Sequence, residues 1–302
     1  MRVNEVLVNL VCCLAAVLGI PANVFVLAAI FYFRKMRTIS NIYIGNLAVA
    51  DLLFLAGTPI VITQSITKDW TFGIVVCKGF VAGNGISQFA SAMFIAVLSM
   101  DRFLGVCYPI RSSMLRTRRA AAIVAILTWA IVVLEITPLF MFIKLVKNSS
   151  TMHYSFCLFF QTSLFSATFD QVEQMHFCST RLFRFFTTYT FTLSYLIPLN
   201  AIWIFYAKII RKLWRRRQQT QHKHKISRRK TTKVTIMGLS IVISYTLCWL
   251  PYWLIQWNLS ILTCASYAAF ALLYINRAVN PFIYVFFSES FKRNVGFIVQ
   301  QV

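Results

Sequence analysis

The chain has 302 residues, of which 59% are hydrophobic and 13% are charged. A soluble domain of this length needs far more charge to cover its surface, so the composition excludes a soluble globular protein and predicts lipid as the solvent for much of the chain. The formal net charge of +22 would suggest nucleic acid as the partner of a soluble protein. Here the basic residues lie between the apolar stretches, where they indicate membrane topology and contact with anionic lipid.

Seven apolar stretches are long enough to cross a membrane, because a hydrocarbon core of about 30 Å needs roughly 20 apolar residues in a helix. In chain order they lie near residues 5–33, 40–65, 74–108, 119–143, 184–213, 232–259 and 264–287. The amphipathic segment that follows, residues 288–297, predicts a short eighth helix. The sequence therefore predicts an all-α membrane protein in which residues 1–302 form one seven-transmembrane helix bundle.

The distribution of Lys and Arg predicts the orientation of the bundle. One set of connections contains dense basic clusters, above all the run from residue 208 to residue 233, whereas the other set is much less basic. Basic loops stay on the cytoplasmic side, so we expect an extracellular N-terminus, a cytoplasmic C-terminus and a multi-pass protein of the plasma membrane. Residues 1–11 lead directly into the first stretch, so no cleavable signal peptide is expected.

Several polar residues interrupt the apolar stretches. Asp51 lies in the middle of the second stretch, Asn23 lies in the first, and Asn276 and Asn280 lie in the seventh. Ionisable residues at this depth cost several kcal/mol and usually mark function. A buried polar group can also serve only to link helices. For Asp51 we favour a functional role, because a lone carboxylate needs a cation or a switching function.

The third stretch has a cysteine near one end and a charged motif at the other. Cys77 precedes Arg102 by twenty-five positions, which as a helix covers roughly 37 Å, so the two residues lie at opposite membrane faces. The loop residues Cys157 and Cys178 are on the oxidising side with Cys77. A disulfide bond between Cys77 and either of them is geometrically natural.

Landmark residues occur in every stretch, in order and at compatible spacings, and through them the chain resembles the rhodopsin-like G protein-coupled receptors over nearly its whole length. They are Asn23; Asn46 with Asp51; Cys77 and Asp101-Arg102-Phe103; Trp129; Pro198 and Tyr206; Cys248-Trp249-Leu250-Pro251; and Asn280-Pro281-Phe282-Ile283-Tyr284. The family's loop cysteine is matched best by Cys157, with Cys178 as the alternative.

The resemblance implies a two-state bundle that an extracellular ligand biases and a heterotrimeric G protein reads. It implies that Asp101 holds Arg102 at rest and that Arg102 meets the G protein on activation. Trp249, one turn below the ligand pocket, would sense the ligand, and Tyr206 and Tyr284 would swing inward. The alternative for these aromatic residues is plain packing of the core.

One residue departs from the family pattern. Relatives usually have a small hydroxyl residue after Asn276, which helps Asp51 and Ser91 to hold a sodium ion, but this chain has Arg277. A guanidinium at that depth needs an anion. Our hypothesis is that Arg277 pairs with Asp51 and occupies the sodium site; the alternative is that it turns toward a water-filled part of the cavity. No other metal and no cofactor is expected.

The resemblance also narrows the class of ligand. Aminergic relatives have an aspartate where this chain has Asn84, and retinal-binding relatives have a lysine where it has Tyr274. The segments 84–91, 105–113 and 248–253 are instead similar to somatostatin and allatostatin-C receptors. This implies an extracellular peptide and a G protein of the inhibitory Gi/o type. The expected pocket residues are Asn84, Gln88, Trp249, Tyr252, Gln256 and Tyr274.

The second outer loop, residues 144–183, has the length of a hairpin lid over a peptide pocket. Asn148 begins a sequon and is a candidate glycosylation site. Glu135, in the fourth stretch, either faces the pocket or is a protonated group that is hydrogen-bonded within the bundle.

Other functional classes fit less well. A transporter would have discontinuous helices or inverted repeats, which the sequence lacks. A decoy receptor is at odds with the intact motifs at Asp101-Arg102 and Asn280-Pro281, and no arrangement of catalytic residues points to an enzyme. The expected partners are a peptide, a G protein and membrane lipids, without nucleic acid.

Overall fold

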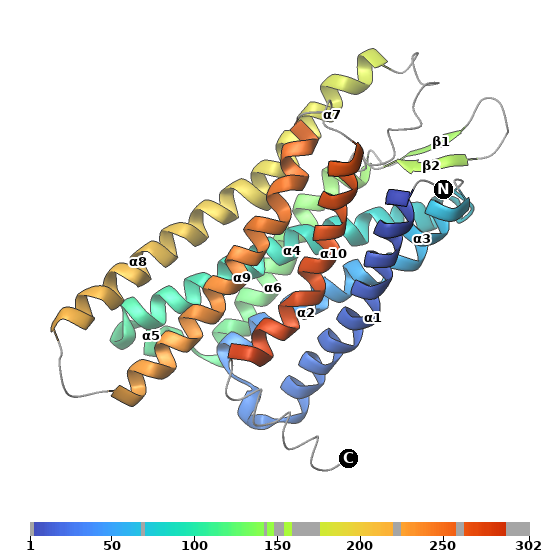
Figure 1. Cartoon of the computed structure of the whole chain (residues 1–302). Coiled ribbons are helices and arrows are strands. Elements are labelled where there is room, and N and C mark those ends of the chain that lie inside the picture. The colour runs from blue at the N-terminus through green and yellow to red at the C-terminus, as the bar shows by residue number, and fades with distance from the viewer. Residues whose placement is uncertain are drawn as a thin grey trace, which may run out of the picture.

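The computed structural model describes residues 3–67, 70–141, 144–147, 154–158, 176–219, 225–257 and 263–287. Within these ranges, seven helical spans are long and apolar enough to cross a membrane, and they pack side by side as one bundle (Figure 1). The predicted seven-transmembrane bundle is confirmed. The predicted eighth helix, residues 288–297, lies outside the described residues.

The first two spans are joined by a short turn. Helix α1 is Val3–Tyr32 and is followed by the 3₁₀ turn η1, Arg34–Met36. Helix α2, Ile39–Leu55, begins after Thr38, whose hydroxyl accepts a hydrogen bond from the backbone N–H of Asn41 at 3.3 Å. This satisfies one of the amides that a helix start leaves without a partner.

The apolar stretch alone suggests one continuous helix for the second span, but the structure contains two helices there. The span breaks after α2 and continues as α3, Thr58–Thr67. Pro59 has no N–H to donate to the carbonyl of Leu55, and the Thr58 hydroxyl donates to that carbonyl instead, at 2.6 Å. Gly57 fits the break because a Cβ there would lie 2.9 Å from the ring of Phe80.

Helix α4, Gly73–Cys107, is the central helix, and α2, α6 and α8 all pack against it. Helix α5, Pro109–Leu115, lies in the connection that follows and has a proline in its first turn, where a missing N–H costs nothing. Helix α6, Arg118–Met141, forms the fourth span.

A two-stranded antiparallel hairpin follows α6, as expected for the second outer loop. Strand β1, Lys144–Lys147, pairs with strand β2, Tyr154–Leu158, and Leu145 is opposite Cys157. Strand β1 lies next to α4. The hairpin is at the same end of the bundle as the start of α1 (Figure 1).

The fifth span contains a local irregularity before a proline. Helix α7, His176–Phe191, leads through the π-helical turn η4, Thr192–Leu196, into α8, Ile197–Gln219. Pro198 has no N–H for the carbonyl of Ser194, and the hydroxyl of Tyr245 from α9 donates to it at 2.8 Å. A side chain of the sixth span therefore stabilises the bend in the fifth.

The last two spans are α9, Lys225–Trp257, and α10, Thr263–Phe287. Pro281 leaves the carbonyl of Arg277 without its helical donor, and the amide of Asn23 on α1 donates to that carbonyl at 3.3 Å. Large apolar side chains such as Phe31, Ile126 and Leu134 are exposed on the outside of the bundle, where lipid would contact them.

Candidate functional site

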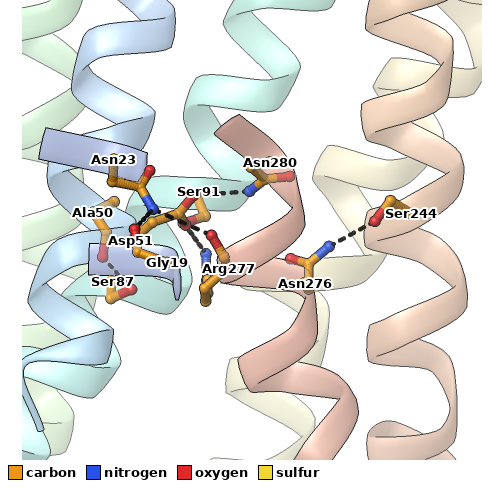
Figure 2. A network of polar contacts seen from close by, with 10 residues as sticks. All are labelled: Gly19, Asn23, Ala50, Asp51, Ser87, Ser91, Ser244, Asn276, Arg277 and Asn280. Atoms are coloured by element: carbon orange, nitrogen blue, oxygen red, sulfur yellow. Dashed lines mark hydrogen bonds and ion pairs between the residues drawn. The ribbon is translucent and has the colours of Figure 1, made fainter. Parts of the chain in front are cut away.

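The centre of the bundle contains an ion pair. Arg277 Nη1 on α10 lies 2.9 Å from Asp51 Oδ1 on α2, and both side chains are completely buried. The other carboxylate oxygen accepts a hydrogen bond from Asn280 Nδ2 at 2.8 Å, and Arg277 Nη1 also donates to Ser91 Oγ on α4 (Figure 2). The structure therefore contains the predicted pair, and Arg277 does not turn away toward a water-filled cavity.

Two asparagines extend this polar core to the neighbouring helices. Asn23 Nδ2 donates to the carbonyl of Gly19 at 2.9 Å as well as to that of Arg277, and Asn276 Nδ2 donates to Ser244 Oγ on α9 at 3.2 Å (Figure 2). Helices α1, α2, α4, α9 and α10 thus meet in one polar region. Ser244 belongs to this polar region, although nothing in the sequence distinguishes this small residue from others in an apolar helix.

The guanidinium of Arg277 lies between two aromatic rings. Its central carbon is 5.2 Å from the ring centre of Phe54 and 5.4 Å from that of Trp249. Both distances are within the range of cation–π attraction. The charged core is therefore in direct contact with Trp249, the residue expected to sense the ligand.

Trp249 is part of a larger aromatic cluster. Its ring centre is 5.7 Å from that of Tyr245 and 5.8 Å from that of Tyr252. The cluster continues through ring contacts to Trp253, Tyr195 and Phe191. It connects α9 with the fifth span at the level of the π-helical turn.

Of the predicted pocket residues, Trp249 and Tyr252 belong to this cluster, and Gln256 is hydrogen-bonded to it. Gln88 Nε2 on α4 donates to Ser194 Oγ at 2.8 Å, and Gln256 Nε2 on α9 donates to Tyr252 Oη at 2.8 Å. Tyr274 packs its ring against Phe54, with 4.9 Å between ring centres. Asn84 is half-buried one turn before Gln88. Their contact with a ligand stays a prediction.

At the other end of α4, Asp101 has an unexpected partner. Arg116, just after α5, binds both carboxylate oxygens, with Nε–Oδ1 2.7 Å and Nη2–Oδ2 2.9 Å. The hydroxyl of Ser40 also donates to Oδ2, at 2.9 Å. Within the described ranges, no hydrogen bond or ion pair joins Asp101 to Arg102, so the implied Asp101–Arg102 pair is not the one in this structure.

A glycine explains how Arg116 reaches this position. A Cβ on Gly105 would lie 2.7 Å from Arg116 Nη1, so the absence of a side chain lets the guanidinium cross α4 to Asp101. Arg116 cannot be singled out by sequence, because several arginines share this connection. Its one signal is the glycine one turn after the Asp101-Arg102 motif.

Two polar groups near this end are buried without hydrogen bonds to described residues. They are Arg102 Nε and Tyr284 Oη. The Tyr206 hydroxyl lies against the backbone of α9, where a Cβ on Gly238 would overlap it. Burying polar atoms without partners costs free energy, so these groups favour any rearrangement that gives them partners. The implied inward swing of the two tyrosines stays a prediction.

The remaining sequence predictions concern the other end of the bundle. Cys77 is buried beside Trp70 and is disulfide-bonded. Cys157 lies in β2 and Cys178 in α7, but their side chains, like Asn148 as a whole, lie outside the described set, so the partner of Cys77 stays a prediction. Glu135 is half-buried, and its Oε2 accepts no hydrogen bond from a described residue.

The sequence is similar to those of known receptors. The family model for seven-transmembrane receptors of the rhodopsin family matches residues 22–284. Mouse somatostatin receptor type 2 is 32% identical over 290 residues, which cover 92% of this chain and 73% of the relative. Rat somatostatin receptor type 1 is 28% identical over 304 residues, 96% of this chain and 71% of the relative. Human neuropeptides B/W receptor type 2 is 29% identical over 292 residues, 93% of this chain and 82% of the relative.

Such proteins are signalling receptors and not enzymes. The match runs from the last third of the first span almost to the end of the seventh, and it includes Asp51, Arg102, Trp249 and Asn280, which are among the residues that carried the resemblance. The chain therefore belongs to the rhodopsin family of seven-transmembrane receptors.

Proposed function

We propose that this receptor lies in the plasma membrane, binds an extracellular peptide and activates a heterotrimeric G protein of the inhibitory Gi/o type. The observation that carries the peptide class is the similarity, over more than nine-tenths of the chain, to relatives named for somatostatin and for neuropeptides B/W. The Gi/o type rests on the same resemblance.

The character of the aromatic cluster supports a peptide over a biogenic amine. Its polar neighbours Gln88 and Gln256 are neutral amides, and Asn84 stands where an aspartate would pair with an ammonium group. Aromatic rings beside amides suit a ligand that presents both apolar side chains and backbone groups. The ligand is thus a peptide whose recognition does not depend on one lysine.

The distribution of charge and the position of the hairpin support the proposed orientation. The start of α1 and the hairpin β1–β2 are at one end of the bundle, and the end of α8 and the start of α9, both rich in basic residues, are at the other (Figure 1). The basic end is the cytoplasmic one under the positive-inside rule. Arg102 then faces the G protein, and the hairpin lies on the ligand's side.

We propose Cys157 as the disulfide partner of Cys77. Cys157 is opposite Leu145 in the hairpin, and β1 lies next to α4, the helix that contains Cys77. The bond would fix the hairpin above the ligand site. Asn148, between the two strands in sequence, would then be glycosylated on the extracellular side.

The test is G protein activation in cells that express the chain, screened against somatostatin-like and allatostatin-C-like cyclic peptides. We expect a nanomolar response that pertussis toxin abolishes and that Cys77→Ala and Arg102→Ala each remove. Cys13→Ala, which changes a free cysteine, is the matched control and leaves the response intact. No response to any peptide despite surface expression contradicts the peptide class, and a toxin-resistant response contradicts Gi/o coupling.

A further inference from the structure

The buried carboxylate of Asp51 needs a positive charge close to it. Its side chain is completely buried among helices, where an uncompensated charge is strongly disfavoured. The family resemblance implies a sodium ion at this position, held by Asp51, Ser91 and a small hydroxyl residue after Asn276. The residues present here decide whether such an ion fits.

They do not fit a sodium ion. Arg277 directs the same nitrogen, Nη1, at Asp51 Oδ1 and at Ser91 Oγ, which are two of the oxygens that the ion would need. Asn280 Nδ2 covers the second carboxylate oxygen at 2.8 Å. The guanidinium already neutralises the carboxylate, and its own charge repels a second cation at close range.

The guanidinium is also enclosed in this position. Arg277 is completely buried, and the rings of Phe54 and Trp249 lie 5.2 Å and 5.4 Å from its central carbon. The guanidinium is covalently part of α10. Unlike a dissolved ion, this cation can neither be released nor vary in concentration.

We propose that Arg277 is a built-in counter-ion that takes the place of sodium, so that the state of this receptor does not depend on the sodium concentration. Removing the guanidinium converts the same region into a cation site. Oxygens of Asp51 and Ser91 are then free to bind a cation. The side-chain amide oxygens of Asn23 and Asn276 lie in the same polar core and accept no hydrogen bond from described residues. A hard monovalent cation takes oxygen ligands of this kind.

The test uses the purified receptor and needs no peptide, so its failure is separate from a failure of the proposed ligand class. Thermal unfolding is compared in isotonic NaCl and KCl. We expect the same midpoint in both salts for the unaltered receptor. Arg277→Ser should unfold at a temperature several degrees higher in NaCl than in KCl, because a bound ion stabilises the folded state by mass action.

Controls separate ion binding from a general loss of packing. The double variant Asp51→Asn/Arg277→Ser lacks the carboxylate and should lose the sodium-specific difference. Arg116→Ser, which breaks the other arginine–aspartate pair, should show none. Arg277→Gln is the second variant in case Arg277→Ser does not fold. A sodium-specific shift in the unaltered receptor overturns the proposal, and so does its absence in a folded Arg277 variant.

Discussion

Two aspartate–arginine pairs lie at two levels of the bundle, and their geometry is nearly the same. The closest approach is 2.9 Å for Asp51–Arg277 and 2.7 Å for Asp101–Arg116. Burial distinguishes them: both side chains of the first pair are 0% exposed, whereas Arg116 is 28% exposed. Burial decides what each pair can do, since water and salt screen an exposed pair and leave a buried one almost untouched.

The surroundings also constrain the central pair more than the cytoplasmic pair. Arg277 is fixed by two rings and by Ser91, so exchange of its partner would leave charges uncompensated in the bundle. Asp101 has a second arginine next to it in sequence, and Arg102 Nε is buried without a hydrogen-bond partner among the described residues. We therefore expect the central pair to be permanent and the cytoplasmic pair to change partners during signalling.

The largest predicted effect is on stability at the central pair. Arg277→Met, measured in KCl, leaves a buried carboxylate without its cation and should lower the free energy of unfolding by about 3–5 kcal/mol. The double variant Asp51→Leu/Arg277→Met removes both charges and should recover most of this loss. The measurement is thermal unfolding of the purified receptor, together with its surface expression.

Arg116→Met is the matched change at the cytoplasmic pair and should cost only about 0–1 kcal/mol, because its guanidinium is partly exposed. Equal losses for the two single variants would show that burial does not distinguish the pairs.

A second prediction tests whether the cytoplasmic end is the part that moves. Gly238→Val places a side chain where the Tyr206 hydroxyl lies, so either the Tyr206 side chain leaves this position or α9 shifts away from α8. Overpacking of this kind costs about 1–3 kcal/mol. We expect ligand-free G protein activation to rise, measured as basal nucleotide exchange in membranes.

The control for this effect removes the side chain that Gly238 accommodates. Tyr206→Ala/Gly238→Val should restore close packing of α8 and α9 and return basal exchange toward that of Tyr206→Ala alone. Basal exchange that is unchanged by Gly238→Val in a stable protein would mean that the contact of Tyr206 with α9 does not hold the cytoplasmic end closed.

The contrast between the pairs also shows which ion pairs can be predicted from the sequence. Asp51 and Arg277 each stand alone in an apolar stretch, so opposite charge and the cost of burial leave few possible partners, and their pairing is predictable. Arg116 is one of several loop arginines, and its role depends on the path that Gly105 opens across α4. The seven spans follow from hydropathy, which is a property of each segment by itself.

Other features depend on contacts between residues, which cannot be predicted from hydropathy. The break before Thr58 follows from Gly57 and Pro59, which a search for apolar stretches passes over because their neighbours are apolar. The hydrogen bond from Tyr245 to the carbonyl of Ser194 requires the relative position of α9 and the fifth span. Likewise, the role of Gly238 is visible only when Tyr206 is seen beside it.

The smallest predicted change in stability, with a distinct change in signalling, is at Arg116. Arg116→Gln removes the bidentate partner of Asp101, whose carboxylate is then expected to bind Arg102, the adjacent guanidinium. Since Arg102 is the residue that meets the G protein in the proposed function, basal activation should fall severalfold while stability changes by about 0–1 kcal/mol. Arg118→Gln, an exposed arginine of the same connection, is the charge-matched control and should leave basal activation unchanged. If Arg116→Gln raises basal activation, then Arg116 restrains the receptor at rest, and the cytoplasmic pair, like the central one, stabilises a single state.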